Sequence, residues 1–267
     1  MSDAAPPPPA PNGQPQTGRR LAGRRVLVTG GTSGIGLAVS QALAEHQARV
    51  FLIGRTATTL ETAVHDLQAG GCDALGMTAD TSSPHDLRKV FGAIDAQWQG
   101  LDVLVNNASL RGTPFWDEDE TQADQLMRVN AGGYVTCAHL AARRMRQQGG
   151  HIVNIGSLSA ELRDGPYASY VAAKSAVRGF SMALGRTVRG AGIKVTLIEP
   201  GFVDTPMIDL PPEDKAQKKR RHEMLEPGDV AEAVIFCLTR APGWMSRCCN
   251  SSPCIRGSMN MQPDRDA

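Results

Sequence analysis

The chain has 267 residues, of which 41% are hydrophobic, and it carries 28 Lys and Arg against 27 Asp and Glu. This hydrophobic fraction supports a real core, which excludes global disorder. The balanced charge argues against a nucleic-acid binder or a membrane-surface protein. No apolar run reaches the roughly 18 residues of a membrane span, and six cysteines are too few for a disulfide scaffold. We expect one main domain in the cytoplasm, with no nucleic-acid or membrane partner and no metal site.

Residues 1–20 differ in composition from the rest of the chain. They include four consecutive prolines, Pro6 to Pro9, and lack the apolar segment of a secretory signal. Such a sequence cannot bury enough apolar surface to order itself, so we predict a disordered or polyproline-like arm. It could act as a ligand for SH3-type domains, but a solubilising tail is the simpler interpretation.

From residue 21 onward, short apolar runs alternate with segments of helical periodicity. The runs predict strands at 26–28, 50–53, 74–77, 103–105, 152–155 and 194–198, and the periodic segments predict helices at 35–43, 60–67, 90–94, 131–147, 170–188 and 229–238. Residues 103–105 show no polar alternation, which indicates burial on both faces. The pattern predicts an α/β fold, a single Rossmann-type doubly wound parallel sheet with helices on both faces, over residues 21–245.

A glycine-rich turn, TGGTSGIG at residues 29–36, lies between the first predicted strand and the first predicted helix. Its glycines allow a tight turn and a close approach of the backbone to a pyrophosphate. The N-terminus of the following helix offers unpaired N–H groups and the positive end of the helix dipole. The spacing is G-x-x-x-G-x-G rather than G-x-G-x-x-G, but the strand–turn–helix context predicts nucleotide binding rather than a purely structural turn.

The second predicted strand ends in Ile53-Gly54-Arg55. In NAD-binding proteins an acidic residue near this position holds the ribose 2′-hydroxyl. Here Gly54 stands in that place, and the guanidinium of Arg55 can bind a 2′-phosphate with two hydrogen bonds. The sequence therefore favours NADP(H) over NAD(H), against the alternative of a solvated arginine at a strand end.

Tyr170 and Lys174 are four residues apart in a predicted helix, so their side chains share one face. A free phenol has a pKa of about 10, too high for easy proton transfer at neutral pH. A nearby ammonium favours the phenolate and lowers that pKa. Tyr170 is thus a candidate general acid or base for a carbonyl and its alcohol.

Three further elements accompany this pair. Ser157 follows the fifth predicted strand, Asn106-Asn107-Ala108 follows the fourth, and Asn130 begins the predicted helix 131–147. Taken singly, Asn130 is equally well a helix cap, and Asn106 and Asn107 a loop pair. Together and in this order, these motifs resemble the short-chain dehydrogenase/reductase family, over roughly residues 21–245.

The resemblance implies a role for each residue. Asn130, Ser157, Tyr170 and Lys174 match the family's catalytic tetrad: Tyr170 protonates the carbonyl oxygen, Ser157 stabilises it, Lys174 holds the nicotinamide ribose and lowers the pKa of Tyr170, and Asn130 keeps a water in a proton relay. The implied cofactor contacts are Gly30, Thr32, Ser33, Gly34, Ile35, Gly36, Arg55, Asp80 at the adenine, Asn107, Ala108, Tyr170, Lys174, Pro200, Gly201, Val203 and Thr205. Ser109 stands where the family's NNAG element has glycine.

The sequence offers alternatives to the catalytic residues Tyr170 and Ser157, and it suggests which segments bind the substrate. Tyr167 has Val171, not a lysine, four residues later, and the spacing to Tyr170 favours Ser157 over Ser159. We expect a small carbonyl or alcohol substrate, held by residues 110–116, 158–166 and 207–227. The last segment is either a mobile lid, whose basic run could attract an acidic substrate, or a solvated helix face, which we favour.

Residues 246–267 depart from the family, whose members usually add a seventh strand there that also builds a subunit interface. The segment shows no alternating apolar pattern, and Cys248, Cys249 and Cys254 fit no zinc-site spacing. We predict an altered, unstructured tail that leaves the sheet edge exposed. The resemblance itself implies a homodimer or homotetramer.

Two hypotheses follow from the sequence. The favoured one is an NADP(H)-dependent oxidoreductase that interconverts a ketone and a secondary alcohol. The alternative, suggested by the proline-rich arm and the unusual tail, is a catalytically weak nucleotide-binding regulatory or scaffold protein of the same fold. The complete tetrad argues against this alternative, because a scaffold has no need of all four groups.

Overall fold

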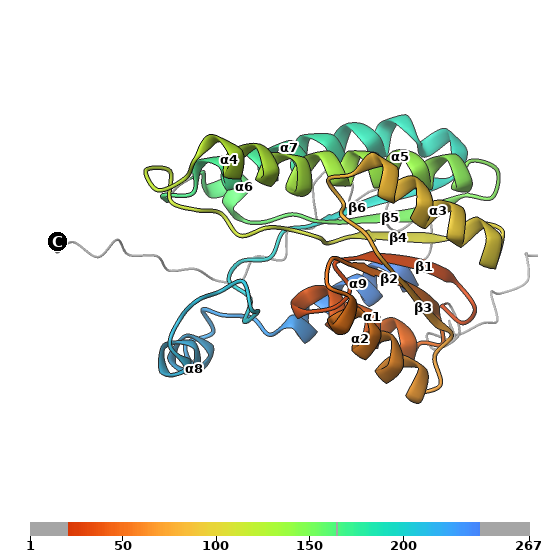
Figure 1. The fold of residues 1–267 in the computed structure, drawn as a ribbon, viewed down its shortest axis with the longest axis horizontal. Helices are drawn as coiled ribbons and strands as arrows, with labels where there is room; N and C mark the ends of the chain where they lie inside the picture. Colours follow the sequence, from red (N-terminus) through yellow and green to blue (C-terminus); the bar gives the residue numbers. More distant parts are fainter. Residues whose placement is uncertain (1–20, 164, 241–267) are drawn as a thin grey trace, which may run out of the picture.

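The computed structural model describes residues 21–163 and 165–240 (Figure 1). Their strands form one parallel sheet in the order β3-β2-β1-β4-β5-β6. The strands are β1 Arg25–Thr29, β2 Arg49–Gly54, β3 Ala74–Thr78, β4 Val103–Asn106, β5 Gly150–Ile155 and β6 Ile193–Ile198. This confirms the predicted fold class. The predicted arm 1–20, the predicted tail 246–267 and the question of a seventh strand lie outside the described residues.

Helices cover both faces of the sheet (Figure 1). On one face lie α1 Gly34–Glu45, α2 Ala57–Ala69 and α9 Pro227–Thr239; on the other lie α3 Pro84–Trp98, α4 Glu120–Met127, α5 Gly133–Met145 and α7 Ala168–Thr187. The described residues also form α6 Ser159–Leu162, the 3₁₀ turn η3 Arg189–Ala191, and α8 Pro212–Arg220.

The uninterrupted apolar strands follow from this two-sided cover. Val26 and Val28 of β1 belong to the core that includes residues of α1, α2 and α9. Leu27, between them, belongs to the opposite core with residues of α3 and α5. Successive side chains of a strand point to opposite faces, so a sheet buried on both faces needs apolar residues at every position.

The strand order reverses between β1 and β4, which places a crevice at the carboxyl edge of the sheet. The glycine turn follows β1, Asn107 follows β4, and Ser157 follows β5, so all three lie at this edge. The strand order alone therefore brings the candidate residues together at one edge of the sheet.

The predicted helix 131–147 is wrong at its start. The helix begins at Glu120 as α4, passes through a π-helical segment η2, Arg128–Gly132, and continues as α5. Asp119 starts it with a capping box, in which its carboxylate accepts from the Gln122 N–H. The periodicity missed α4 because Leu126 is its one buried residue. Asn130 consequently lies inside a continuous helix rather than at its start.

No helix within residues 21–163 and 165–240 is long and apolar enough to span a membrane.

His151 of β5 makes folding sensitive to acid. Its Nε2 lies 2.8 Å from Thr196 Oγ1, and burial lowers its pKa from 6.5 to about 3. Below pH 6.5 the His151 side chain is therefore protonated in the unfolded chain but stays neutral in the folded chain. The free energy of unfolding consequently falls as the pH drops from 6.5 toward 3, by at most about 1.4 kcal/mol per pH unit.

We expect His151→Gln to flatten this acid-dependent loss, as measured by urea unfolding at several pH values. His65→Gln, which changes a side chain with 80% exposure, serves as the control and should keep the parent slope. Equal slopes in all three proteins would contradict the assignment.

Candidate active site

The glycine turn is fixed between β1 and the loop after β4. Gly30 adopts a φ of +64°, and a Cβ on Gly36 would lie 2.0 Å from the Gly30 carbonyl oxygen and 2.5 Å from Asn107 Nδ2. Asn107 Nδ2 donates hydrogen bonds to the carbonyl oxygens of Thr29 and Gly30, at 3.0 and 3.1 Å. Only glycine fits at position 36, because a side chain would break this close contact.

Helix α1 begins at Gly34, within the glycine-rich motif, and the side chain of its N-cap, Ser33, makes no capping hydrogen bond. The first N–H groups of a helix have no partner within the helix and carry the positive end of its dipole. The turn therefore presents a helix terminus suited to an anion at the crevice, and the binding of a pyrophosphate there stays a prediction.

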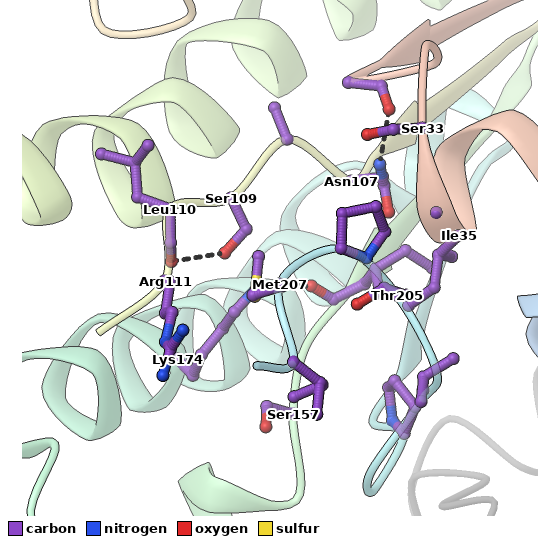
Figure 2. A pocket seen from close by; sticks show the side chains of 18 of the residues that line it. Ser33, Ile35, Asn107, Ser109, Leu110, Arg111, Ser157, Lys174, Thr205 and Met207 are labelled. Atoms are coloured by element: carbon purple, nitrogen blue, oxygen red, sulfur yellow. Dashed lines mark hydrogen bonds between the residues drawn. The ribbon is translucent and has the colours of Figure 1, made fainter. Parts of the chain in front are cut away.

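Figure 2 shows the crevice beside this terminus, a cavity of about 400 Å³. Fourteen of the predicted site residues line it, from six separate segments of the chain: Gly30, Ser33, Gly34, Ile35, Arg55, Asn107, Ala108, Ser157, Tyr170, Lys174, Pro200, Gly201, Val203 and Thr205. Four predicted residues, Thr32, Gly36, Asp80 and Asn130, are not part of its lining. Leu110 and Arg111, from the predicted substrate segment 110–116, also line the cavity, and so does Ser109, which the sequence did not mark as a site residue.

Arg55, which lies just beyond β2, is also part of the crevice lining. A Cβ on Gly54 would lie 2.7 Å from Thr32 Cγ2, so Thr32 occupies the space beside the glycine. Asp80 Oδ1 accepts hydrogen bonds from the N–H and the hydroxyl of Ser82, both at 2.8 Å. The Asp80 carboxylate is thus held by its own turn, and its contact with an adenine stays a prediction.

Tyr170 lines the crevice together with two serines, Ser157 and Ser109. Burial raises the pKa of Tyr170, and the hydroxyls of these two serines oppose the rise. Ser157 in turn donates to Ser159 Oγ at 3.1 Å and accepts from the Ser159 N–H at 3.2 Å. Of the two rival serines, Ser157 lines the crevice with Tyr170, whereas Ser159 does not and instead hydrogen-bonds with Ser157.

Lys174 lies beneath the tyrosine and is fully buried. Its Nζ donates to the Ile155 carbonyl oxygen at 3.1 Å and to the Tyr134 hydroxyl at 3.4 Å, and it lies 5.8 Å from the ring centre of Tyr170. Burial lowers the pKa of Lys174 to about 7. The lowering of the Tyr170 pKa by the Lys174 ammonium stays a prediction.

Tyr134 is a site residue that the sequence did not reveal. Its hydroxyl donates to the Ile155 carbonyl oxygen at 3.0 Å and accepts from Lys174. Helical spacing offered a signal, because Tyr134 lies four residues after Asn130.

Asn130 acts on the loop after β4 and caps no helix. Its Oδ1 accepts from the Leu110 N–H at 2.6 Å, and its Nδ2 donates to the Leu110 carbonyl oxygen at 2.9 Å. This double hydrogen bond fixes the backbone next to Ser109. Asn130 is completely buried in η2, so its side chain positions the loop, and the water relay stays a prediction.

A second cavity of about 470 Å³ adjoins the crevice. All three segments predicted to hold the substrate contribute to it, through Arg111 and Gly112, through residues 158–166, and through residues 207–218. Ser157 and Tyr170 line both cavities. The two hydroxyls therefore lie at the junction between the crevice and the second cavity.

The charged segment 207–227 contains α8, which has no buried residue, as expected for a solvated helix face. Lys215 Nζ lies 3.0 Å from Asp204, and Lys219 pairs with both Asp204 and Glu226. Part of the basic run is thus paired with carboxylates of this chain, next to the loop that carries Val203.

Comparisons with known proteins agree with this geometry. A family model described as short chain dehydrogenase matches residues 24–216. The 3-oxoacyl-acyl-carrier-protein reductase FabG of Vibrio cholerae is 31% identical over 222 residues, 81% of this chain and 90% of that protein. Among similar crystal structures, a dehydrogenase/reductase from Sinorhizobium meliloti 1021 has 30% sequence identity and a TM-score of 0.76, and the match covers 83% of this chain and 90% of that one. A short chain dehydrogenase from Burkholderia cenocepacia J2315 in complex with NADP has 31% identity and a TM-score of 0.75, and the match covers 82% of this chain and 92% of that one. The chain therefore belongs to the short-chain dehydrogenase/reductase family of oxidoreductases.

Proposed function

We propose that this protein is an NADP(H)-dependent oxidoreductase that interconverts a ketone and a secondary alcohol, with Tyr170 as the general acid and base. One observation carries the proposal: the hydroxyls of Ser157 and Tyr170 lie where an anion-binding crevice meets a second, largely apolar cavity. A proton donor at such a junction can reach a substrate in one cavity and a nucleotide in the other.

The crevice fits a dinucleotide phosphate. A glycine cradle and the N-terminus of α1 suit the pyrophosphate, and Arg55 suits a 2′-phosphate. Lys174 would hold the nicotinamide ribose, and the nicotinamide end would lie against Pro200, Gly201, Val203 and Thr205. When bound, the nucleotide supplies a hydride for the carbonyl carbon or accepts one from the alcohol. The NADP complex of the Burkholderia cenocepacia relative supports this choice of cofactor.

Side chains of the protein then transfer the proton to or from the substrate oxygen. In reduction, Tyr170 donates its hydroxyl proton to the substrate oxygen, and Ser157 donates a hydrogen bond to the same oxygen as negative charge develops there. In oxidation, the Tyr170 phenolate accepts the proton of the alcohol. Lys174 is buried beside the tyrosine, and its ammonium form favours the phenolate.

The second cavity indicates the class of substrate. Its walls include several apolar side chains: Leu158, Leu162, Tyr167, Phe202, Met207, Ile208 and Leu210. Arg111 and Lys218 supply cationic groups. We therefore expect ketones with an apolar body to be better substrates than small hydrophilic carbonyl compounds.

The direct test is NADPH consumption by the purified protein with a panel of aliphatic, cyclic and aromatic ketones, repeated with NADH. The proposal expects turnover of the apolar members and faster reaction with NADPH. NADP binding by calorimetry without turnover of any carbonyl would instead support the scaffold alternative.

Arg55 should decide between the two nucleotides. We expect Arg55→Ala to raise the Kd for NADP by about tenfold or more, because charge-assisted hydrogen bonds to a phosphate are lost. The Kd for NAD, measured by the same calorimetry, should stay unchanged. Arg88→Ala, an exposed arginine of α3 away from the crevice, is the matched control. Equal weakening of both nucleotides would remove Arg55 from 2′-phosphate recognition.

We also propose a cytoplasmic homodimer or homotetramer. Exposed apolar side chains on the helices of one face support a subunit contact there, including Val135 of α5 at 45% exposure and Met182 of α7 at 49%. Light scattering of the purified protein tests the assembly.

A further inference from the structure

Tyr134, near the start of α5, carries a buried phenol that the proposed reaction does not use. It lines neither the crevice nor the second cavity. Its hydroxyl nevertheless accepts a hydrogen bond from Lys174 Nζ at 3.4 Å and donates one to the Ile155 carbonyl oxygen at 3.0 Å. The centre of its ring lies 5.2 Å from the same Nζ. Tyr134 therefore contacts Lys174 through both its hydroxyl and its ring.

The fold fixes the position of Tyr134 by contacts other than that with Lys174. Its backbone carbonyl oxygen accepts a hydrogen bond from Asn106 Nδ2 at 3.2 Å, which ties the start of α5 to the end of β4. Its side chain packs in a buried cluster with Val177 of α7 and Leu197 of β6. The phenol is thus a fixed group to which the long, flexible side chain of Lys174 is anchored.

The hydroxyl of Tyr134 can hold the amine of Lys174 but cannot relay a proton from it. Burial raises the pKa of Tyr134 well above its usual value, so the hydroxyl keeps its proton. That proton is donated to the Ile155 carbonyl oxygen, and the lone pairs of the hydroxyl oxygen remain for Lys174 Nζ. A backbone carbonyl oxygen has no proton to pass on, so the contact orients the amine.

Counting protons at Lys174 shows why this orientation matters. An ammonium has three protons to donate. The Ile155 carbonyl oxygen and the Tyr134 hydroxyl accept two of them, and no carboxylate within residues 21–163 and 165–240 forms an ion pair with Lys174. The third proton remains for the crevice, which Lys174 also lines (Figure 2). A neutral amine has only two protons, and the protein would use both.

We propose that Tyr134 is a positioning residue that holds the ammonium of Lys174 at the end of β5 through its hydroxyl and its ring, so that one ammonium proton stays available to the nucleotide. The inference rests on the proposed function, which assigns Lys174 to the nicotinamide ribose. A ring at this distance from a cation also stabilises the charge itself.

The first test measures the ionisation of Lys174 without nucleotide or turnover. Carbon-13 labelling of lysine Cε gives one signal per lysine, and the signal lost in Lys174→Met belongs to Lys174. Burial lowers the pKa of Lys174 to about 7, so its titration lies in an accessible pH range. Tyr134→Phe removes the hydroxyl and keeps the ring. It should lower the midpoint by about one pH unit, because a hydrogen bond to a charged group is lost.

Tyr167→Phe is the matched control for this titration. It loses the same oxygen atom from a tyrosine that is 37% exposed, and it should leave the midpoint of Lys174 unchanged. An unchanged midpoint in Tyr134→Phe, or an equal shift in both variants, would refute the role of the Tyr134 hydroxyl.

A second measurement needs no substitution at Tyr134. The chain has three tyrosines, so carbon-13 labelling at tyrosine Cζ gives three signals. Tyr167→Phe and Tyr170→Phe identify two of them, and the third belongs to Tyr134. In the parent protein the Tyr134 signal should shift with the same midpoint as Lys174, because its hydroxyl accepts a hydrogen bond from the ionising group. A Tyr134 signal that stays constant through that midpoint would contradict the contact.

The consequence for the nucleotide is tested by calorimetry with NADP over a range of pH. Below both midpoints Lys174 is an ammonium in the parent and in Tyr134→Phe, so the two Kd values should agree within about twofold. Above both midpoints the variant should bind more weakly, by up to about tenfold for a shift of one unit. An equal loss of affinity at every pH would make Tyr134 a packing residue only. If the parent does not bind NADP, the proposed function fails, while the lysine titration still decides whether Tyr134 holds the ammonium.

Discussion

Tyr170→Phe is expected to slow carbonyl reduction by about a hundredfold to ten-thousandfold, the range typical for loss of a general acid. The substitution removes the proton that the substrate oxygen must receive and leaves the Tyr170 Cβ, which packs against the loop at Gly112, in place. NADP binding should stay within about twofold of the parent, because the cradle at α1 and Arg55 are untouched. The measurements are NADPH consumption with the best ketone of the panel and calorimetry with NADP.

The matched control is Tyr167→Phe. Tyr167 lines the same second cavity, three residues before Tyr170, and loses the same atom. It lies outside the lining of the nucleotide crevice, so its variant should keep kcat and change at most KM. Parent-like rates in Tyr170→Phe, or an equal loss of kcat in both variants, would exclude Tyr170 as the proton donor.

Gly36→Ala is expected to abolish NADP binding and to lower the free energy of unfolding by about 3 kcal/mol or more. The added methyl carbon would lie 2.0 Å from the Gly30 carbonyl oxygen and 2.5 Å from Asn107 Nδ2. Relief requires the turn to separate from the loop after β4, which breaks the hydrogen bonds that Asn107 donates and reshapes the phosphate cradle. Urea unfolding and calorimetry with NADP measure the two effects.

Gly92→Ala provides the matched control for this change. Gly92 lies within α3, and a Cβ built there meets nothing within 4 Å. Alanine is the better helix former, so this variant should gain roughly 0.5–1 kcal/mol of stability and bind NADP normally. If Gly36→Ala bound NADP as well as Gly92→Ala, the turn would not be the nucleotide site.

The comparison of sequence and structure is most instructive at the helices. The helix after the glycine turn and the helix with Tyr170 have strong periodic apolar faces, and both were predicted close to their observed bounds. Helix α4 has one buried residue and α8 has none, so neither shows the periodicity on which such prediction depends. An exposed helix is specified by its caps and its charges, which are weaker signals.

In the candidate active site too, local sequence patterns predicted some residues and missed others. Spacing along one chain placed Tyr170 and Lys174 on a shared helix face, and motif order pointed to Ser157. The hydrogen bond from Tyr134 to the Ile155 carbonyl oxygen joins residues far apart in the chain, as do the two hydrogen bonds between Asn130 and Leu110. Local periodicity carries no information about such pairs, because strand order and loop packing bring them together.

The amino-acid sequence by itself determined the parallel sheet, the nucleotide turn and the order of the chemical groups, because apolar periodicity and glycine requirements act within a few residues of each other. Only the tertiary structure decided that Ser109 lines the crevice, that Asn130 fixes a loop from within a helix, and that burial lowers the pKa of Lys174. These outcomes depend on desolvation and on contacts between distant segments, and both exist only after the core has packed.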